Sequence, residues 1–241
     1  MKTCIPKNIT IFSNEESEKA YIISLLLKDA LEKGFNVVIL DWDGIYRKYL
    51  PNFNYYGGNS LPSLSPSNVD IIELITDLLV LSDPQRYYLE RVIEQINDFK
   101  DLPEHILDSL QFNIGTATVL ARKMRDLFSE GSEKLISKTG ISYKELGEKL
   151  RGISIIDLSA IENARLKKLY AMMILNFLVK YYVENKGEKL YLLLDGPEKY
   201  LRSTLIDRTM QENNINLCII ANEHELKNII KTPALHFNVL Y

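Results

Sequence analysis

The sequence is poor in the residues that build disulfide frameworks and metal sites. Only two cysteines occur among 241 residues, Cys4 and Cys218, and the second lies in the apolar run LCIIA, which is typical of a buried strand. The three histidines, His105, His224 and His236, have no second ligand at metal-binding spacing. A disulfide scaffold and a zinc site are therefore excluded, no metal site is expected, and the cysteine usage fits a reducing cytoplasm.

The sequence also lacks any apolar run of about 18 residues, which a transmembrane helix would need. Its first residues, MKTCIPKNITIF, contain no apolar stretch of signal-peptide length. An excess of positive charge is absent too: the formal net charge is -3 and the pI is about 5.7. Binding nucleic acid through bulk charge is disfavoured, because it requires many Lys and Arg to neutralise phosphates. We expect a cytoplasmic protein without a membrane segment, on which a local basic face remains open.

Apolar residues make up 46% of the chain and charged residues 25%, which is the composition of a folded domain with a substantial core. No linker rich in Pro, Gly or Ser separates two halves of different composition, and no internal repeat is present. The sequence therefore predicts a single domain over residues 1–241.

Short β-type runs alternate with stretches of helical spacing. Strands are expected at residues 9–12, 36–41, 152–157, 189–195, 216–221 and 234–240, and helices at 16–33, 161–184, 198–213 and 223–231. Continuous apolar strands such as VVIL indicate a parallel sheet covered on both faces. Residues 46–67 have the composition of a loop, and a helical insertion follows at about 67–150. We predict an α/β three-layer sandwich with a mostly parallel central sheet and a helical insertion after the second strand.

The turn after the first strand is the first candidate site, because open parallel sheets bind ligands at the carboxyl ends of their strands. A phosphate-binding P-loop has Gly at its first and sixth positions, followed by Lys and by Ser or Thr. On that pattern the turn keeps Lys19, whereas Ser13 and Glu18 replace the glycines and Ala20 replaces the hydroxyl that holds Mg²⁺.

The charge of this turn also opposes a nucleotide. Glu15, Glu16 and Glu18 would repel a triphosphate. Ser17 is a further candidate nucleotide-binding position in this turn, and Asp41 is another at the end of the second strand. The same residues are equally those of an acidic helix N-terminus that complements the helix dipole. On its own this segment would not be identified as a P-loop.

The second candidate site is the end of the apolar strand in LYLLLDGPEKYL. Asp195 ends this run as a Walker B aspartate does, but Gly196 follows where an active enzyme usually has a Glu that activates water. Alternatively, Asp195 is a strand-end residue that caps a helix starting near Glu198.

Several segments stand in the order found in one family. NVVILDWDGIY resembles the D-P-H-G-E-Y segment of the HerA/FtsK superfamily ATPases, particularly HerA and its VirB4-like relatives. Asp41, Gly44 and Tyr46 match this segment, while Asp43 and Ile45 stand where His and Glu are usual. The run SDPQRYYLERVIEQI is similar to the family's helical insertion.

Two later segments extend the resemblance over nearly the whole chain. ISIIDLSAIENARLKKLY resembles the family's V-I-D-L-S-G-L segment with its long helix, and NINLCIIANEHELK resembles a strand that ends in A-S-Q. The family's Gln, which senses the γ-phosphate, would fall on Glu223. The resemblance implies a RecA-like P-loop fold without the family's N-terminal β-barrel, since the chain starts at strand one.

The departures from the family pattern fall on the catalytic positions, while the apolar strands and their spacing persist. The leading interpretation is a pseudo-ATPase: a structural or regulatory subunit in a DNA-processing or translocation assembly. No cofactor is expected, and ATP with Mg²⁺ would bind only if the site retains residual affinity. The resemblance implies a homo-oligomer, or a hetero-oligomer with an active ATPase or nuclease, with DNA as a further candidate partner.

Two alternatives remain open. One is a divergent nucleotide hydrolase that uses Lys19 and Asp195 and borrows groups from a partner. The other is a nucleic-acid-binding α/β module that uses the basic cluster Arg122, Lys123 and Arg125, which is otherwise the solvated face of a helix.

Overall fold

The computed structural model describes residues 8–13, 15–109, 114–129, 131–199, 209, 211–221 and 238–240. The chain divides into two compact units. The first comprises residues 1–61, 144–160 and 178–241, and the second comprises residues 62–143 and 161–177. One domain over residues 1–241 stays a prediction, because compact units of this kind can be parts of one domain.

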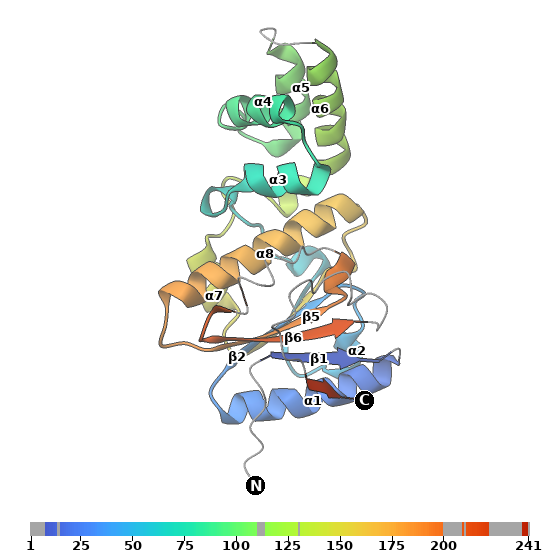
Figure 1. Cartoon of the computed structure of the whole chain (residues 1–241), viewed down its shortest axis with the longest axis vertical. Coiled ribbons are helices and arrows are strands. Elements are labelled where there is room, and N and C mark those ends of the chain that lie inside the picture. The colour runs from blue at the N-terminus through green and yellow to red at the C-terminus, as the bar shows by residue number, and fades with distance from the viewer. Residues whose placement is uncertain are drawn as a thin grey trace. The chain divides into compact units, whose positions relative to one another are not determined.

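The first unit is built on a parallel sheet (Figure 1). Its described strands are β1 (Asn8–Phe12), β2 (Asn36–Asp41), β3 (Asn54–Gly57), β4 (Ile153–Asp157), β5 (Leu190–Asp195), β6 (Ile215–Ala221) and β7 (Asn238–Leu240). They lie in the order β3-β4-β2-β5-β6-β1-β7, and every described pairing is parallel. The α/β class and the parallel sheet are confirmed.

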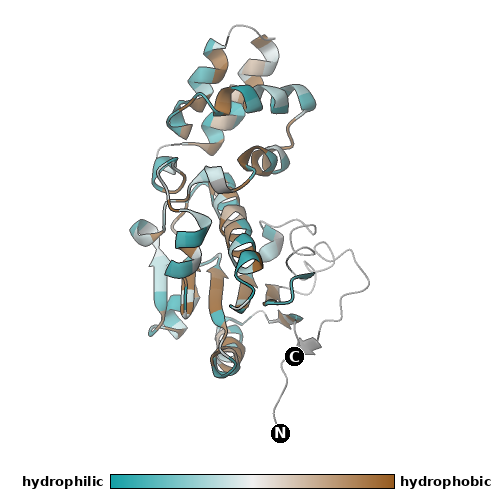
Figure 2. Ribbon diagram, turned by 90° about the vertical axis from the view of Figure 1, so that its left-hand side faces the viewer, coloured by the Kyte–Doolittle hydropathy of each residue, from teal (hydrophilic) through white to brown (hydrophobic). Residues whose placement is uncertain are grey.

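The central strands are buried along almost their whole length, which explains their continuous apolar runs. In β4 and β5 every residue is buried, and in β2 every residue after Asn36. Figure 2 shows the apolar residues gathered on strands in the middle of the sheet, with polar and apolar residues mixed along the helices. Helix α1 (Glu16–Glu32) packs Ile23 and Leu27 into a cluster with side chains from five strands.

The segment predicted as a loop contains regular structure, which is a correction to the sequence analysis. It holds helix α2 (Tyr46–Tyr49), strand β3 at the edge of the sheet, and short 3-10 helices at Gly58–Ser60 and Pro66–Asn68. Strand β3 is only four residues long and runs into a Gly-Gly pair, so its pattern is too short to stand out from the surrounding turn residues. Among the described strands, β3 pairs with β4 alone.

The second unit contains most of the predicted helical insertion. Its helices are α3 (Ile71–Leu79), α4 (Asp83–Ile93), α5 (Leu102–Asp108) and α6 (Ile114–Leu127). The side chain of Asp70 caps α3 by accepting from the Glu73 amide, which fixes the start of this helix at Ile71. Pro84 lies in the first turn of α4, where its missing amide hydrogen costs no helical hydrogen bond.

Two further helices include residues of both units. Helix α7 (Tyr143–Lys149), which lies within the predicted helical insertion, precedes β4, and helix α8 (Ala164–Glu184) continues past residue 177 into the first unit. The helix predicted at 223–231 and most of the one predicted at 198–213 lie outside the described residues. Across the described part of the chain, no helix is both long enough and apolar enough to cross a membrane.

Gly147 in α7 tests how closely α7 approaches α8. A Cβ atom at Gly147 would lie 2.3 Å from Cγ of Tyr181, whose hydroxyl accepts a hydrogen bond from Arg151. We expect Gly147→Ala to lower the free energy of unfolding by about 1–3 kcal/mol through overpacking. Denaturant-induced unfolding would measure the change.

Gly187 provides the matched control, because a Cβ atom there would meet nothing within 4 Å. Gly187→Ala should leave stability unchanged or raise it by up to about 1 kcal/mol, because Ala restricts the unfolded chain. Equal effects of the two substitutions would contradict the close approach of α7 to Tyr181.

Candidate functional site

Parallel strands bring the carboxyl ends of β2, β4 and β5 to one edge of the sheet. Each of these strands ends on an aspartate: Asp41, Asp157 and Asp195. Asp41 and Asp157 are register partners, and β5 pairs with β2 on its other side. All three side chains are buried, so this edge carries a concentration of carboxyl groups that the chain must stabilise.

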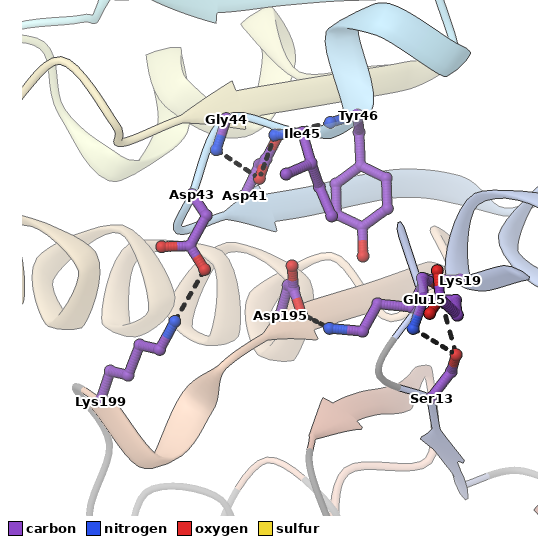
Figure 3. Close-up of polar contacts among 10 residues, drawn as sticks. All are labelled: Ser13, Glu15, Lys19, Asp41, Asp43, Gly44, Ile45, Tyr46, Asp195 and Lys199. Carbon is purple, nitrogen blue, oxygen red and sulfur yellow. Dashed lines mark hydrogen bonds and ion pairs between the residues drawn. The ribbon is translucent and has the colours of Figure 1, made fainter. Parts of the chain in front are cut away.

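Asp41 organises the turn that follows β2. Its Oδ1 accepts from the amides of Gly44 (2.8 Å) and Ile45 (3.1 Å), and its Oδ2 accepts from the amide of Tyr46 (2.9 Å), as Figure 3 shows. Burial raises the pKa of Asp41 to about 6, with a smaller contribution from Asp157, although the three amides act in the opposite direction. The turn is therefore built around one carboxyl group.

Gly44 locks this turn against the end of β4. It has φ +77°, and a Cβ atom there would lie 2.5 Å from Oγ of Ser159. Asp157 accepts from the Ser159 amide (2.7 Å) and from the hydroxyl of Tyr55, whose ring lies 4.4 Å from the Arg47 guanidinium. A side chain at position 44 would displace these groups.

Tyr46 points from this turn toward the end of β5. Its side chain is fully buried, and Figure 3 shows its hydroxyl directed toward Asp195. Burial raises the pKa of Tyr46, and the nearby charge of Asp195 raises it further, so the hydroxyl keeps its proton.

The structure brings together two residues singled out from the sequence, Lys19 and Asp195. Lys19 Nζ lies 3.7 Å from Asp195 Oδ1, and their side chains are 16% and 5% exposed. Strand β6 lies between β1 and β5, so the carboxyl ends of β1 and β5 are about 10 Å apart. The long side chain of Lys19, which follows β1, crosses this distance to reach Asp195 at the end of β5. Burial raises the pKa of Asp195, and the charge of Lys19 opposes that shift.

The turn after β1 is closed by its own side chains. Ser13 Oγ accepts from the Glu15 amide (3.0 Å) and donates to Oε2 of Glu18 (2.9 Å). Ser17 is exposed, and Ala20, which stands where the P-loop pattern has a Ser or Thr hydroxyl, is buried and has only a methyl side chain. The two residues that replace glycines in the P-loop pattern are thus bonded to each other.

The segment after β5 adds a contact that the sequence analysis missed. Gly196 has φ +60° and donates its amide to the Ile220 carbonyl oxygen, and a 3-10 helix (Pro197–Lys199) follows. Lys199 Nζ lies 2.7 Å from Oδ2 of Asp43. Both side chains are partly exposed, so this pair contributes little to stability but joins the β5 segment to the β2 turn. No local pattern links residues so far apart in sequence.

Other predicted positions lie elsewhere. Glu223 lies outside the described residues. Within the described ranges, no group of three or more His, Cys, Asp or Glu side chains is placed to hold a metal ion. The carboxylates at the sheet edge are instead engaged by amides, hydroxyls and lysines.

The basic cluster belongs to α6 in the second unit and is largely used within that unit. Lys123 Nζ donates to the carbonyl oxygen of Leu79 (3.2 Å) in the last turn of α3, where a cation complements the helix dipole. Arg125 pairs with Glu104 at 3.0 Å. Arg122 is exposed.

The raised pKa of Asp41 predicts how stability depends on pH. The folded state keeps this proton up to about pH 6, whereas the unfolded state loses it near pH 3.9. The contribution is therefore fully present below the unfolded pKa and is lost as the pH rises to about 6, a decrease of about 3 kcal/mol. Asp195, whose pKa is also raised, acts in the same direction.

The comparison of wild type with Asp41→Asn isolates this contribution. Asn keeps an oxygen that accepts from the Gly44 and Ile45 amides, but it does not titrate. Any other effect of the substitution therefore changes the free energy of unfolding by the same amount at every pH. Urea unfolding between pH 4 and 7 should show the wild type losing stability relative to the variant as pH rises. Parallel stability curves would contradict the shifted pKa.

A comparison with protein families identifies the chain's relatives. Residues 18–178 match the family model DUF87, described as "Helicase HerA, central domain". No curated protein sequence matches the chain.

Solved structures share its fold. VirB4 of Thermoanaerobacter pseudethanolicus superimposes with a TM-score of 0.67 and 17% identity, covering 90% of this chain and 70% of VirB4. The bacterial conjugative coupling protein TrwBdeltaN70 matches in its unbound monoclinic form with a TM-score of 0.60, 13% identity and 92% of this chain covered. Its trigonal form in complex with sulphate gives a TM-score of 0.57 at the same identity and coverage.

The chain spans 63% and 65% of the two TrwBdeltaN70 chains, and at these identities the likeness shows the fold alone. The expected P-loop fold is confirmed by these structures. Because the family model covers most of the sequence, from the first turn of α1 into α8, the chain belongs to the HerA helicase central-domain family.

Proposed function

We propose that this protein is a catalytically inactive member of its family that acts as a structural or regulatory subunit in a DNA-processing or translocation assembly. The observation that carries the proposal is the closure of the turn after β1. Ser13 and Glu18 bond to each other there, while Lys19 pairs with Asp195. The groups that would meet a phosphate are already occupied by the chain.

Mg²⁺ with ATP, which the family implies, does not fit the residues present. Ala20 is buried and offers no oxygen to a metal ion. Glu15, Glu16 and Glu18 are exposed around the start of α1, where they repel a polyphosphate. Gly196 supplies no carboxylate to activate water beside Asp195. We therefore derive no catalytic step through a bound nucleotide.

The frame around the site supports a role in assembly. The sheet keeps its parallel register, and the turn after β2 is well ordered by the hydrogen bonds to Asp41 and by the close approach of Gly44 to Ser159. On this proposal, only the turn after β1 has lost its P-loop residues. A subunit that keeps the family's fold can also keep the surfaces through which it binds its partners. We propose a homo-oligomer, or a hetero-oligomer with an active ATPase or nuclease, in which DNA is a candidate substrate of the assembly.

The conjugative role of one structural relative is consistent with this proposal. TrwB is a bacterial conjugative coupling protein, and VirB4 shares the same fold. By analogy, the assembly proposed for this chain would move or process DNA.

A second candidate is a divergent hydrolase, favoured by one specific observation. Lys19 and Asp195 lie 3.7 Å apart, close to the buried hydroxyl of Tyr46, so a basic and an acidic group remain together at the sheet edge. Such an enzyme would need further groups from a partner.

Calorimetric titration with ATP and Mg²⁺ separates the two candidates. The proteins to compare are the wild type, Lys19→Ala and Lys28→Ala; Lys28 is an exposed residue of the same helix, so its removal changes the net charge equally. For a subunit without a nucleotide site, we expect no binding tighter than about 1 mM in any of the three.

A divergent hydrolase gives a different pattern. The wild type and Lys28→Ala would bind ATP with micromolar affinity, and Lys19→Ala would lose that binding. This result would overturn the proposal of an inactive subunit.

A further inference from the structure

The second unit contains a pocket that the proposed function does not use. Its volume is about 310 Å³, which lies at the lower end of the range for small-molecule sites. Its apolar walls are formed by buried residues from the start of α3, the end of α4 and the segments beside these helices: Pro66, Ile71, Ile93 and Phe99. An apolar group that entered this pocket would be removed from water, which favours its binding.

The backbone fixes one side of the pocket before any ligand binds. The Ser137 amide donates to the Leu64 carbonyl oxygen at 3.1 Å. Gly140 approaches the same residue so closely that a Cβ atom there would lie 2.5 Å from the carbonyl carbon of Leu64. The turn that carries Lys138 is therefore held against the segment that leads into the pocket wall. A pocket formed in advance costs a ligand little ordering.

Two opposite charges lie at this pocket without neutralising each other. Glu94 and Lys138 both line it, and both side chains are exposed. In the described part of the chain, neither of them belongs to an ion pair. Lys138 Nζ donates to the carbonyl oxygen of Ile96, which leaves its charge in place and leaves it further protons to donate. A ligand that carries both charges would satisfy both residues.

The position of Glu94 favours a cationic group at its end of the pocket. Glu94 is the C-cap residue of α4, where the helix dipole is negative and disfavours an anion. The nearby cation of the last turn, Arg91, lies over the Tyr87 ring at 5.1 Å from its centre. A ligand ammonium group beside Glu94 would therefore be attracted by the carboxylate and by the helix dipole together.

We infer that this pocket binds an apolar α-amino acid. The amino-acid side chain enters the apolar cavity, its ammonium group meets Glu94, and its carboxylate meets Lys138. Such a site is independent of the turn after β1, because all of its residues belong to the second unit.

Calorimetric titration of the whole protein with L-phenylalanine tests the inference. We expect a dissociation constant of about 1 mM or tighter. Two analogues each lack one charge: hydrocinnamate has no ammonium group, and phenethylamine has no carboxylate. Each should bind at least about tenfold more weakly, because one charged residue of the pocket then loses its partner. L-serine, which has both charges but no apolar side chain, should show no binding.

Substitutions of the two charged residues test their roles separately. Glu94→Gln and Lys138→Met remove one charge each and keep most of the side-chain length, and each should weaken L-phenylalanine binding at least about tenfold. Because Lys138 also bonds to the Ile96 carbonyl oxygen, thermal unfolding checks that Lys138→Met is folded. If it is not, Glu94→Gln decides.

Glu90 and Lys134 supply the matched controls, because they carry the same charges in the same unit and do not line the pocket. Glu90→Gln and Lys134→Met should bind L-phenylalanine as the wild type does. Equal losses in these controls would trace the effect to net charge and would contradict the inference.

Two further results would overturn the inference. One is the absence of L-phenylalanine binding by the wild type. The other is equal binding of L-phenylalanine and of the analogues that lack one charge, since the pocket would then recognise only an apolar group. Neither result bears on the proposed inactive subunit, which the titration with ATP and Mg²⁺ tests separately.

Discussion

The site depends on a constraint of the sheet: its strands run in the same direction, so their carboxyl ends meet at a single edge. Three neighbouring strands end there on Asp41, Asp157 and Asp195, all of them buried. Each carboxyl group requires partners, since an unpaired buried charge is costly. The turns that follow the strands supply them, and the geometry of the whole edge follows from that requirement.

The partners of these carboxyl groups explain how the carboxyl ends of the strands are stable without a bound ligand. Asp41 holds three backbone amides, and Asp195 lies against Lys19. Both arrangements stabilise the edge in the absence of a ligand. The contact between Ser13 and Glu18 adds to this stability in the turn after β1, and membership of the HerA central-domain family does not by itself imply hydrolysis.

The sequence was sufficient to predict the parallel sheet, because long apolar runs and their order carry that information, and it singled out Lys19 and Asp195 as candidate site residues. The ion pair between these two residues was found only in the structure. The sequence did not predict strand β3. This strand has only four residues, it lies among turn-forming residues, and as an edge strand it does not need a run of apolar side chains. The contact of Lys199 with Asp43 depends on backbone paths far apart in sequence, so no local pattern indicates it. Lys123, which looked like part of a basic surface, instead caps a helix that only the tertiary structure brings near.

The central proposal is that the side chains of the turn after β1, bonded to one another, leave no site for a nucleotide phosphate. A crystal structure of the protein grown with millimolar ADP and Mg²⁺ tests it most directly. The account predicts an unliganded turn, with Glu18 bonded to Ser13 and Lys19 paired with Asp195 as observed at 3.7 Å. A diphosphate bound at the start of α1, with Lys19 turned from Asp195 toward it, would contradict the account.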